Sequence, residues 1–234
     1  MREKNSLILY CRKEAPGVVR RIDPIGGSPS QGNPFSGDAN NPSSKYYACG
    51  IRNGFGIDFD PVTGKLWDAE NGEDVYDEIN LVEAGFNSGW KLVMGPIAPS
   101  GISAESDLVN FEGSHYADPV FSWAELRGIT DIEFLKSSTL GPSYKDNIFI
   151  RDITEGNLFF FEVNDDRTGQ RLEDKPSLSD LQANSEEDSS LVTLGTGFKW
   201  ITDIETGPDG NLYVLTYDRG AHGQGGLYRI VPST

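Results

Sequence analysis

An internal repeat constrains the fold of this chain more than any other feature. The segment Gly56 to Trp67 (GIDFDPVTGKLW) and the segment Asp203 to Val214 (DIETGPDGNLYV) both fit a strand, a turn and a second strand. A third copy begins at Ile129 with the string ITDIEF. The copies recur at seventy-odd residues, which is longer than the roughly forty to fifty residues of compact propeller repeats. Long loops between the strands account for the excess.

Each copy also carries the turn chemistry of a hairpin. Pro61-Val62-Thr63-Gly64 and Pro208-Asp209-Gly210 supply a fixed φ followed by a residue that adopts positive φ without strain. The copies are therefore candidate blades of an all-β propeller. Together with the expected strands between Leu7 and Ile22 they make about three and a half to four four-stranded blades of a partial, open propeller. A β-sandwich built from the same hairpins is the alternative.

Short apolar runs rich in β-branched and aromatic residues, separated by 27 glycines and 13 prolines, support an all-β chain. One short surface helix is expected over Pro176 to Asn184. The turn-rich stretches Ile25 to Ser44 and Met94 to Ala117 are expected to be long loops. The expected strands are Leu7 to Tyr10, Gly17 to Ile22, Gly56 to Phe59, Lys65 to Trp67, Ile79 to Val82, Ile129 to Phe134, Asn147 to Ile150, Asn157 to Val163, Ile201 to Glu205, Asn211 to Thr216 and Gly226 to Val231.

The charge of the chain excludes several classes of partner. Among its 234 residues, 20 Lys and Arg stand against 36 Asp and Glu, which gives a formal net charge of −16. Such a surface repels nucleic-acid phosphates and anionic lipid headgroups, and it attracts cations. No apolar run approaches the length of a membrane span, and the start of the chain has too short an apolar run for a signal peptide. Cys11 and Cys49 allow at most one disulfide, and the sequence leaves their redox state open.

Two loops carry groups suited to binding. The run GIRNGFG presents Arg52 and Asn53 between glycines before a strand, where a guanidinium and an amide can bind one ligand. A solvated loop charge is an equally good interpretation of Arg52. The run Glu70 to Asn80 places five carboxylates around Gly72, and hard cations such as Ca²⁺ bind several oxygen atoms. A plain acidic surface loop is the alternative.

The order of these motifs resembles the glucose/sorbosone dehydrogenase family of sugar dehydrogenases that depend on pyrroloquinoline quinone (PQQ). The matching strings are GIRNGFGIDFDPVTGKLWDAENG, DEINLVEAGFNSGW, ITDIETGPDGNLYVLTYDRG and GLYRIVP, and the match covers essentially the whole chain. The resemblance implies a six-bladed β-propeller with PQQ on its top face. Residues 1–234 match its C-terminal half, as a single partial domain, so the chain is expected to be a fragment. The family also suggests a periplasmic or extracellular location.

The resemblance assigns residues to the cofactor. Arg52 and Asn53 match quinone-contacting positions, where the guanidinium would stabilise charge that develops on reduction. Asn71 matches a third position on the cofactor side.

The same resemblance assigns calcium ligands. Gly72 and Glu73 match the residues whose backbone carbonyls bind the Ca²⁺ that polarises PQQ. Asp77 and Glu78 match a carboxylate pair that serves a structural Ca²⁺ in some members. Where this chain has Glu73 the family usually has proline, a change that keeps the carbonyl but loosens the turn.

The chain departs from the family in its catalytic base. The family uses a histidine of the N-terminal half, which has no counterpart here, and neither His115 nor His222 matches it. No catalytic residue is therefore assigned.

A second departure concerns cations. The family often has Lys or Arg where this chain has Thr154, Trp200 and Thr202. Lys199 or Arg151 is a candidate substitute for the missing positive charge.

The activity implied by the resemblance is oxidation of an aldose by hydride transfer to a quinone bound over Ca²⁺. This chain alone is expected to be inactive. The alternative is a non-catalytic, calcium-stabilised propeller module that binds carbohydrate or a partner protein. Open blade edges favour self-association or a partner chain in either case.

Overall fold

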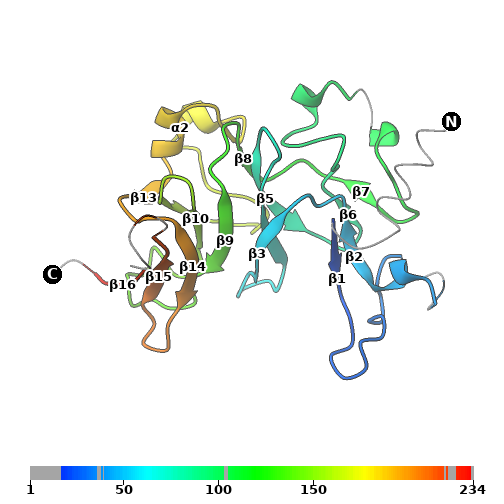
Figure 1. The fold of residues 1–234 in the computed structure, drawn as a ribbon, viewed down its shortest axis with the longest axis horizontal. Helices are drawn as coiled ribbons and strands as arrows, with labels where there is room; N and C mark the ends of the chain where they lie inside the picture. The colour runs from blue at the N-terminus through cyan, green and yellow to red at the C-terminus, as the bar shows by residue number, and fades with distance from the viewer. Residues whose placement is uncertain are drawn as a thin grey trace. The chain divides into compact units, whose positions relative to one another are not determined.

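The computed structural model describes residues 17–35, 38, 40–102, 105–218, 220 and 225–232. The expected strand Leu7 to Tyr10 lies outside this range. By its contacts the chain divides into two compact units, residues 1–53 with 82–119 and residues 54–81 with 120–234. Each unit is described by itself (Figure 1). No helix in the described part of the chain is long and apolar enough to cross a bilayer.

The first unit contains one small sheet in the order β1-β2-β6-β7. Strands β1 and β2 are antiparallel, whereas β2 with β6 and β6 with β7 are parallel. Phe35, Tyr46 and Cys49 are buried together beside this sheet. Most of the unit consists of the two turn-rich stretches expected as loops. Its elements are β1 (Val18–Arg20), η1 (Pro42–Lys45), β2 (Tyr46–Cys49), β6 (Phe86–Asn87), η2 (Ala98–Ser100), η3 (Glu105–Asp107) and β7 (His115–Tyr116).

The second unit contains three sheets, in the orders β12-β8-β5-β4-β3, β13-β11-β10-β9 and β14-β15-β16. The first consists of β3 (Gly54–Phe59), β4 (Leu66–Glu70), β5 (Asp77–Val82), β8 (Phe121–Trp123) and β12 (Gln182–Ala183). The second consists of β9 (Ile129–Phe134), β10 (Ile148–Asp152), β11 (Leu158–Phe161) and β13 (Thr193–Gly195). The third consists of β14 (Ile201–Thr206), β15 (Leu212–Thr216) and β16 (Gly226–Ile230), and the helical elements are η4 (Pro176–Leu178) and α2 (Glu186–Ser190).

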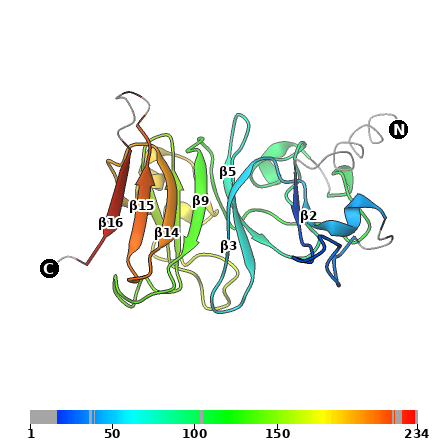
Figure 2. The ribbon, with the colours of Figure 1, turned by 60° about the horizontal axis from the view of Figure 1, so that its bottom comes forward.

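The three sheets correspond to the three copies of the repeat. Strands β3, β9 and β14 each begin one copy and lie side by side, as Figure 2 shows. Each is followed by an antiparallel partner, so every copy is a blade that starts from an inner strand. The prediction of an all-β partial propeller is confirmed.

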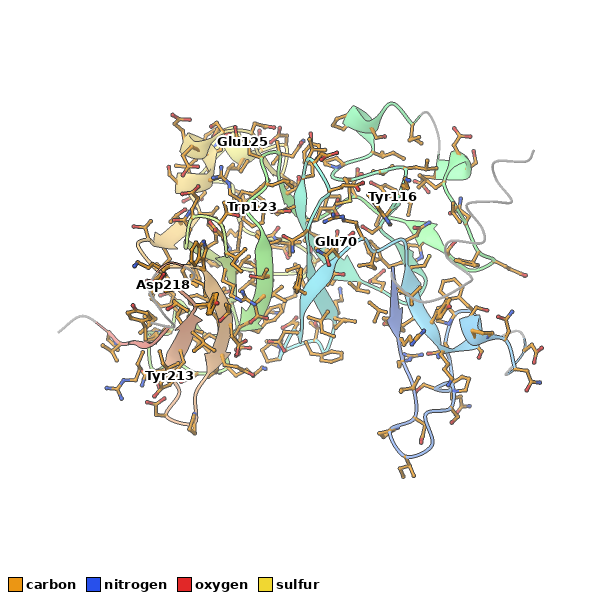
Figure 3. The ribbon with its side chains drawn as sticks, viewed as in Figure 1. Glu70, Tyr116, Trp123, Glu125, Tyr213 and Asp218 are labelled. Carbon is orange, nitrogen blue, oxygen red and sulfur yellow. The ribbon has the colours of Figure 1, made fainter. Side chains whose placement is uncertain are left out.

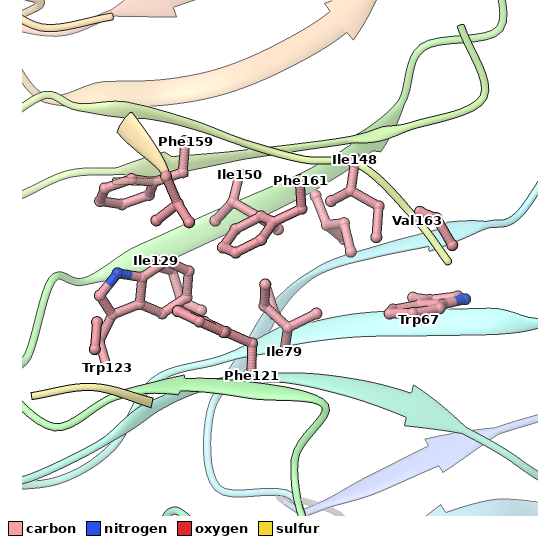
Figure 4. Close-up of a cluster of buried hydrophobic side chains, with 14 of the residues drawn as sticks. Trp67, Ile79, Phe121, Trp123, Ile129, Ile148, Ile150, Phe159, Phe161 and Val163 are labelled. Atoms are coloured by element: carbon pink, nitrogen blue, oxygen red, sulfur yellow. The ribbon is translucent and has the colours of Figure 1, made fainter. Parts of the chain in front are cut away.

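Apolar side chains fill the spaces between neighbouring sheets. Between the first and second sheets, Trp67 packs against Phe134. Trp123 packs against Phe159 and Phe161 in the same cluster (Figure 4). A second cluster, formed by Leu135, Phe149, Leu158, Ile201, Ile204, Leu212 and Val214, lies between the second and third sheets. Alternation along each strand sends one set of side chains to each neighbouring sheet.

Carboxylates on the inner strands tie neighbouring sheets together. Asp58 Oδ2 accepts the backbone N–H of Phe134 across 2.9 Å, and Asp131 Oδ2 accepts that of Ile204 across 3.0 Å. Glu133 Oε1 accepts the N–H of Thr206 across 3.1 Å. We refer to these hydrogen bonds as the inter-blade ladder. It joins the blades through main-chain donors and not only through apolar packing.

The prediction of a helix over Pro176 to Asn184 was wrong. Only Pro176–Leu178 forms a 3-10 turn, and Leu181 has a φ of 61°, which is incompatible with a continuing helix. The α-helix begins after Ser185, whose hydroxyl caps the N–H of Asp188 across 3.2 Å. A run of acidic residues favours the first turn of a helix. Strands β2, β8 and β13 were not expected, because each has only three or four residues, too few to show a clear pattern of apolar residues.

Candidate cofactor-binding rim

Loops from all three sheets of the second unit emerge at the same ends of the inner strands. The register pairs Gly54 with Glu70, Ile129 with Asp152, and Ile201 with Thr216. In each hairpin, the start of the inner strand therefore lies beside the end of the next strand. We call this edge the rim. It comprises residues 71–76, 127–128, 153–156, 198–200 and 217–218. Figure 3 labels Asp218, which belongs to the rim, and Glu70, the last residue of β4 before it.

The Asn71–Tyr76 turn is held tightly to the rim. Asn71 is buried, and its Nδ2 donates to the carbonyl of Ile129 across 2.5 Å. The N–H of Gly72 donates to Asp77 Oδ1 across 3.0 Å. A Cβ at Gly72 would collide with the carbonyl oxygens of Val75 and Tyr76. The turn therefore requires glycine at this position.

Asp77 connects this turn to the next rim segment. Its Oδ2 accepts the backbone N–H groups of Arg127 and Gly128, both across 2.6 Å, while Oδ1 accepts that of Gly72. Burial raises the pKa of Asp77, and these backbone donors act in the opposite direction. Both carboxylate oxygens of Asp77 thus bind main chain, which makes this side chain an anchor for two loops.

The structure does not bring Asp77 and Glu78 together as a pair. They are consecutive residues of β5, so their side chains point to opposite faces of the sheet. Glu78 is buried, and its Oε2 accepts from Asn80 Nδ2 across 3.2 Å. In the part of the chain that the structure describes, no group of three or more His, Cys, Asp and Glu side chains is arranged to hold a metal ion.

The five carboxylates of the acidic loop separate into two sets. Glu70, Asp77 and Glu78 are buried, whereas Glu73 and Asp74 are exposed at the tip of the turn. Because three of the five carboxylates are buried, a plain acidic surface loop does not describe the whole set.

A cavity of about 320 Å³ opens on the rim between the second and third sheets. Of its lining residues, Lys199 is the one with a positive charge, and its side chain is 72% exposed. Lys199 Nζ lies 2.9 Å from Asp218 Oδ2, and this carboxylate raises the pKa of Lys199. The lining consists of Thr154, Glu155, Phe198, Lys199, Trp200 and Asp218.

The cavity brings together Thr154 and Trp200, two of the positions at which the family that the chain resembles often has Lys or Arg, with Lys199 beside them. Gly156 permits the close approach of the two loops, because a Cβ there would collide with the carbonyl of Phe198. The N–H of Tyr217 donates to the Trp200 carbonyl across 3.0 Å, and this hydrogen bond holds the segment that carries Asp218 beside Trp200.

Arg151 does not reach this cavity. Its guanidinium is buried between the second and third sheets, where NH1 donates to the Ile201 carbonyl across 2.5 Å and NH2 to the Thr130 carbonyl across 2.6 Å. It also forms an ion pair of 3.5 Å with Asp131. Of the two candidate substitutes, Lys199 is therefore the one that lines the rim.

Arg52 and Asn53 belong to the first unit and are half-buried. The guanidinium carbon of Arg52 lies 5.8 Å from the ring centroid of Trp90, within range of a cation–π contact. The N–H of Trp90 donates to the carbonyl of Gly50 across 2.9 Å. The GIRN and GFNSGW motifs, far apart in sequence, are thus neighbours in this unit.

His115 is exposed on β7 of the first unit, and His222 lies outside the described residues, as does Cys11. Asp218 and Phe198 were not expected as cavity residues. The internal repeat could have indicated that these loops lie at one edge. The second strand of each copy is followed at the equivalent position by one residue, which is Asn71, Ile153 or Tyr217.

Comparison with known proteins identifies the family. Residues 11–229 match the model of the family described as "Glucose / Sorbosone dehydrogenase". The aldose sugar dehydrogenase YliI of Escherichia coli is 29% identical over 203 residues, which are 86% of this chain and 48% of that protein. Quinoprotein glucose dehydrogenase B of Acinetobacter calcoaceticus is 39% identical over 85 residues, 36% of this chain and 17% of that protein. The chain spans about half the length of the first two curated relatives it matches.

Solved structures agree with the sequence comparison. The apo form of the soluble aldose sugar dehydrogenase of Escherichia coli superposes with a TM-score of 0.63 at 27% identity, covering 93% of this chain and 55% of that one. The PQQ-bound aldose sugar dehydrogenase of Streptomyces coelicolor has the same fold, with a TM-score of 0.59 at 22% identity and coverage of 94% and 52%. The resemblance seen in the motifs is confirmed, and this chain belongs to the glucose/sorbosone dehydrogenase family.

Proposed function

We propose that this chain provides part of the PQQ site of an aldose dehydrogenase, with the Lys199 cavity and the Asn71–Tyr76 turn as cofactor-binding elements. The observation that carries the proposal is the position of both on one rim, linked through Asp77, Arg127 and the loop after β10. On the resemblance of the GIRN motif alone, Arg52 and Asn53 are also proposed as quinone contacts.

The chemistry of the rim fits a planar, anionic quinone. Phe198 and Trp200 offer aromatic surface, and Lys199 offers a cation for a carboxylate. When bound, PQQ would supply the acceptor for the hydride that leaves the sugar carbon. The chain itself contributes binding and orientation, and it excludes water from one side of the cofactor.

The charges of the cavity favour a bound cation beside an anionic ligand. Lys199 is opposed there by Glu155 and Asp218, so the lining has more negative than positive groups. An anionic ligand would be repelled unless a metal ion neutralised part of that charge. The backbone carbonyls of Gly72 and Glu73 are the proposed Ca²⁺ ligands, since hard cations bind such oxygens. We therefore expect PQQ binding to depend on Ca²⁺.

Proton transfer from the sugar has no assigned residue. In the described part of the chain no histidine lies on the rim. We expect binding without turnover by this chain alone.

A calcium-stabilised module without catalysis is the second candidate. It is favoured by the pairing of Lys199 with Asp218, which leaves less of the lysine's charge for an incoming anion.

Titration of the chain with PQQ, followed by quenching of tryptophan fluorescence with and without Ca²⁺, tests the proposal. Lys199→Met should raise the dissociation constant at least about tenfold, equivalent to about 1.4 kcal/mol. Lys145→Met is the matched control, because Lys145 also pairs with an aspartate, at 3.6 Å, but precedes β10 at the end away from the rim. Equal affinities of the two variants, or no PQQ binding in Ca²⁺, would overturn it. A rise in melting temperature with Ca²⁺ but no PQQ binding would support the module instead.

A further inference from the structure

A second cavity, of about 590 Å³, lies at the outer edge of the second sheet, where β11 and β13 pair. We call it the outer cavity. It is lined by residues 160–162, 171–175 and 191–194, all of which belong to the second unit. The second sheet has an apolar cluster on each face, one shared with the first sheet and the other with the third. The opening of the outer cavity therefore does not result from a sheet face that lacks a neighbour.

Main-chain hydrogen bonds hold the two walls of the outer cavity against one strand. The N–H of Arg171 donates to the carbonyl of Glu162, just beyond the end of β11, across 2.7 Å. Two residues earlier, the N–H of Phe160 donates to the carbonyl of Val192 across 2.8 Å. Residues two apart on a strand direct their main-chain groups to the same side. Both walls therefore lie along one edge, and the cavity between them is built into the fold of the second unit.

Apolar side chains of the outer cavity are left open to solvent. Leu191 and Leu194 are 46% and 42% exposed, whereas Val192 between them is buried in the cluster shared with the first sheet. Leu172 contributes to the opposite wall. The volume of the cavity lies within the roughly 300–1,000 Å³ of ordinary ligand-binding cavities. The outer cavity is therefore large enough to take an apolar side chain of a partner.

The charge around the outer cavity is strongly negative. In residues 162–190, nine acidic residues stand against three basic ones, which gives −6 of the net charge of −16. About an eighth of the chain thus carries more than a third of its net charge. Glu162, Glu173 and Asp174 line the cavity itself, and the three acidic residues of α2 lead directly into its second wall.

The cations of the lining are already neutralised. Arg171 forms ion pairs with Glu162 and Asp165, at 3.2 and 2.6 Å. Lys175 forms one with Asp174 at 2.8 Å. These ion pairs leave no excess of positive charge for an anionic ligand, and the surrounding carboxylates attract a cationic partner.

We propose that the outer cavity docks a basic segment of a partner protein. An apolar side chain of that segment sits between Leu172, Leu191 and Leu194, and the basic residues on either side of it lie against the carboxylates of residues 162–174. Charge complementarity selects a basic partner, and the apolar cavity fixes its position. The outer cavity shares no residue with the rim, so this inference is independent of the proposed cofactor function.

Amide NMR of the full chain, titrated at low salt with a blocked Lys-Leu-Lys-Leu-Lys peptide, tests the proposal. The signals of residues 171–175 and 191–194 should shift, with an affinity that falls as salt is added. A Lys-Ser-Lys-Ser-Lys peptide, which has the same charge but no apolar side chain, should bind at least about threefold more weakly. Equal affinities of the two peptides would indicate attraction of charge alone and overturn the proposal. Unchanged signals in both segments would overturn it as well, including the case in which another part of the same protein covers the cavity.

Variants of the chain test the charged and the apolar part of the contact separately. Glu173→Lys and Leu194→Ser should each raise the dissociation constant of the Lys-Leu-Lys-Leu-Lys peptide at least about threefold. Glu112→Lys and Leu126→Ser are matched controls, because both residues are exposed and neither lines the cavity. Circular dichroism establishes that all four variants are folded. An unchanged affinity in either cavity variant, or an equal loss in its control, would contradict the proposal.

Discussion

The carboxylate of Glu133 accepts the backbone N–H of Thr206 across 3.1 Å and also bonds to the Thr206 hydroxyl, so one acidic side chain fastens the third blade to the second. Burial raises the pKa of Glu133 to about 7 from an ordinary 4.5. The folded state therefore holds this proton more tightly than the unfolded state does. The resulting stabilisation is complete below about pH 4.5 and is lost as the pH rises through about 7.

Replacement of Glu133 by Gln should flatten this part of the pH profile. The free energy of unfolding of the unmodified chain should fall between pH 5 and pH 8 by about 1–2 kcal/mol more than that of Glu133→Gln. Urea unfolding at both pH values measures the difference. Since Gln still accepts the Thr206 N–H, parallel profiles for the two proteins would show that Glu133 does not titrate in this range.

Loss of the Asp77 anchor should destabilise the rim. Asp77→Ala removes the acceptor for three backbone N–H groups, of Gly72, Arg127 and Gly128. Leaving buried donors unpaired should lower the free energy of unfolding by about 2–4 kcal/mol. Asp74→Ala, on the exposed part of the same loop, should change it by less than about 0.5 kcal/mol. Equal values from urea melts would mean that Asp77 does not hold the turn.

Two phenylalanines at equivalent positions of the repeat should respond differently to truncation. Phe134 is fully buried, with its ring centroid 5.9 Å from that of Trp67, and Phe134→Ala should cost about 3–5 kcal/mol. Phe59 is 57% exposed, and Phe59→Ala should cost the monomer less than about 0.5 kcal/mol. Denaturant unfolding at low protein concentration makes the comparison. A large loss at Phe59 would show that its side chain is covered within the monomer.

The proposed binding of Ca²⁺ through the main-chain carbonyls of Gly72 and Glu73 predicts different effects of substitutions at these two positions. Glu73→Ala keeps its carbonyl, so the rise in melting temperature on addition of Ca²⁺ should persist. Gly72→Ala forces a Cβ against the carbonyls of Val75 and Tyr76 and should abolish that rise. Differential scanning calorimetry with Ca²⁺ or a chelator measures both. Loss of the rise in Glu73→Ala would instead identify its carboxylate as the ligand.

The sequence predicts the inner strands well because each copy combines apolar alternation with a proline and glycine turn. Ile129 to Phe134 forms a strand with the bounds expected, and β14 and β15 differ from expectation by one residue at one end. The outer strands were missed, since β8 has only three residues and β13 follows a helix. Their pairing depends on long-range partners that no local pattern encodes.

The candidate site was predicted only in part. The acidic loop and the Arg52 motif are visible as motifs, whereas the anchoring by Asp77 depends on Arg127 and Gly128, some fifty residues later. The choice between Lys199 and Arg151 could not be made from sequence. It depends on which side chain forms hydrogen bonds inside the array of sheets. Arg151 does so, because its guanidinium donates to the carbonyls of Thr130 and Ile201.

The inter-blade ladder also determines which substitutions the array of sheets tolerates. Asp58 and Asp131 accept the backbone N–H groups of Phe134 and Ile204. These hydrogen bonds do not involve the side chains at the two positions. Side chains there can vary with the apolar filling, but an imino acid removes the hydrogen itself. Proline is thus the replacement that this architecture forbids at both positions, however well its ring might pack.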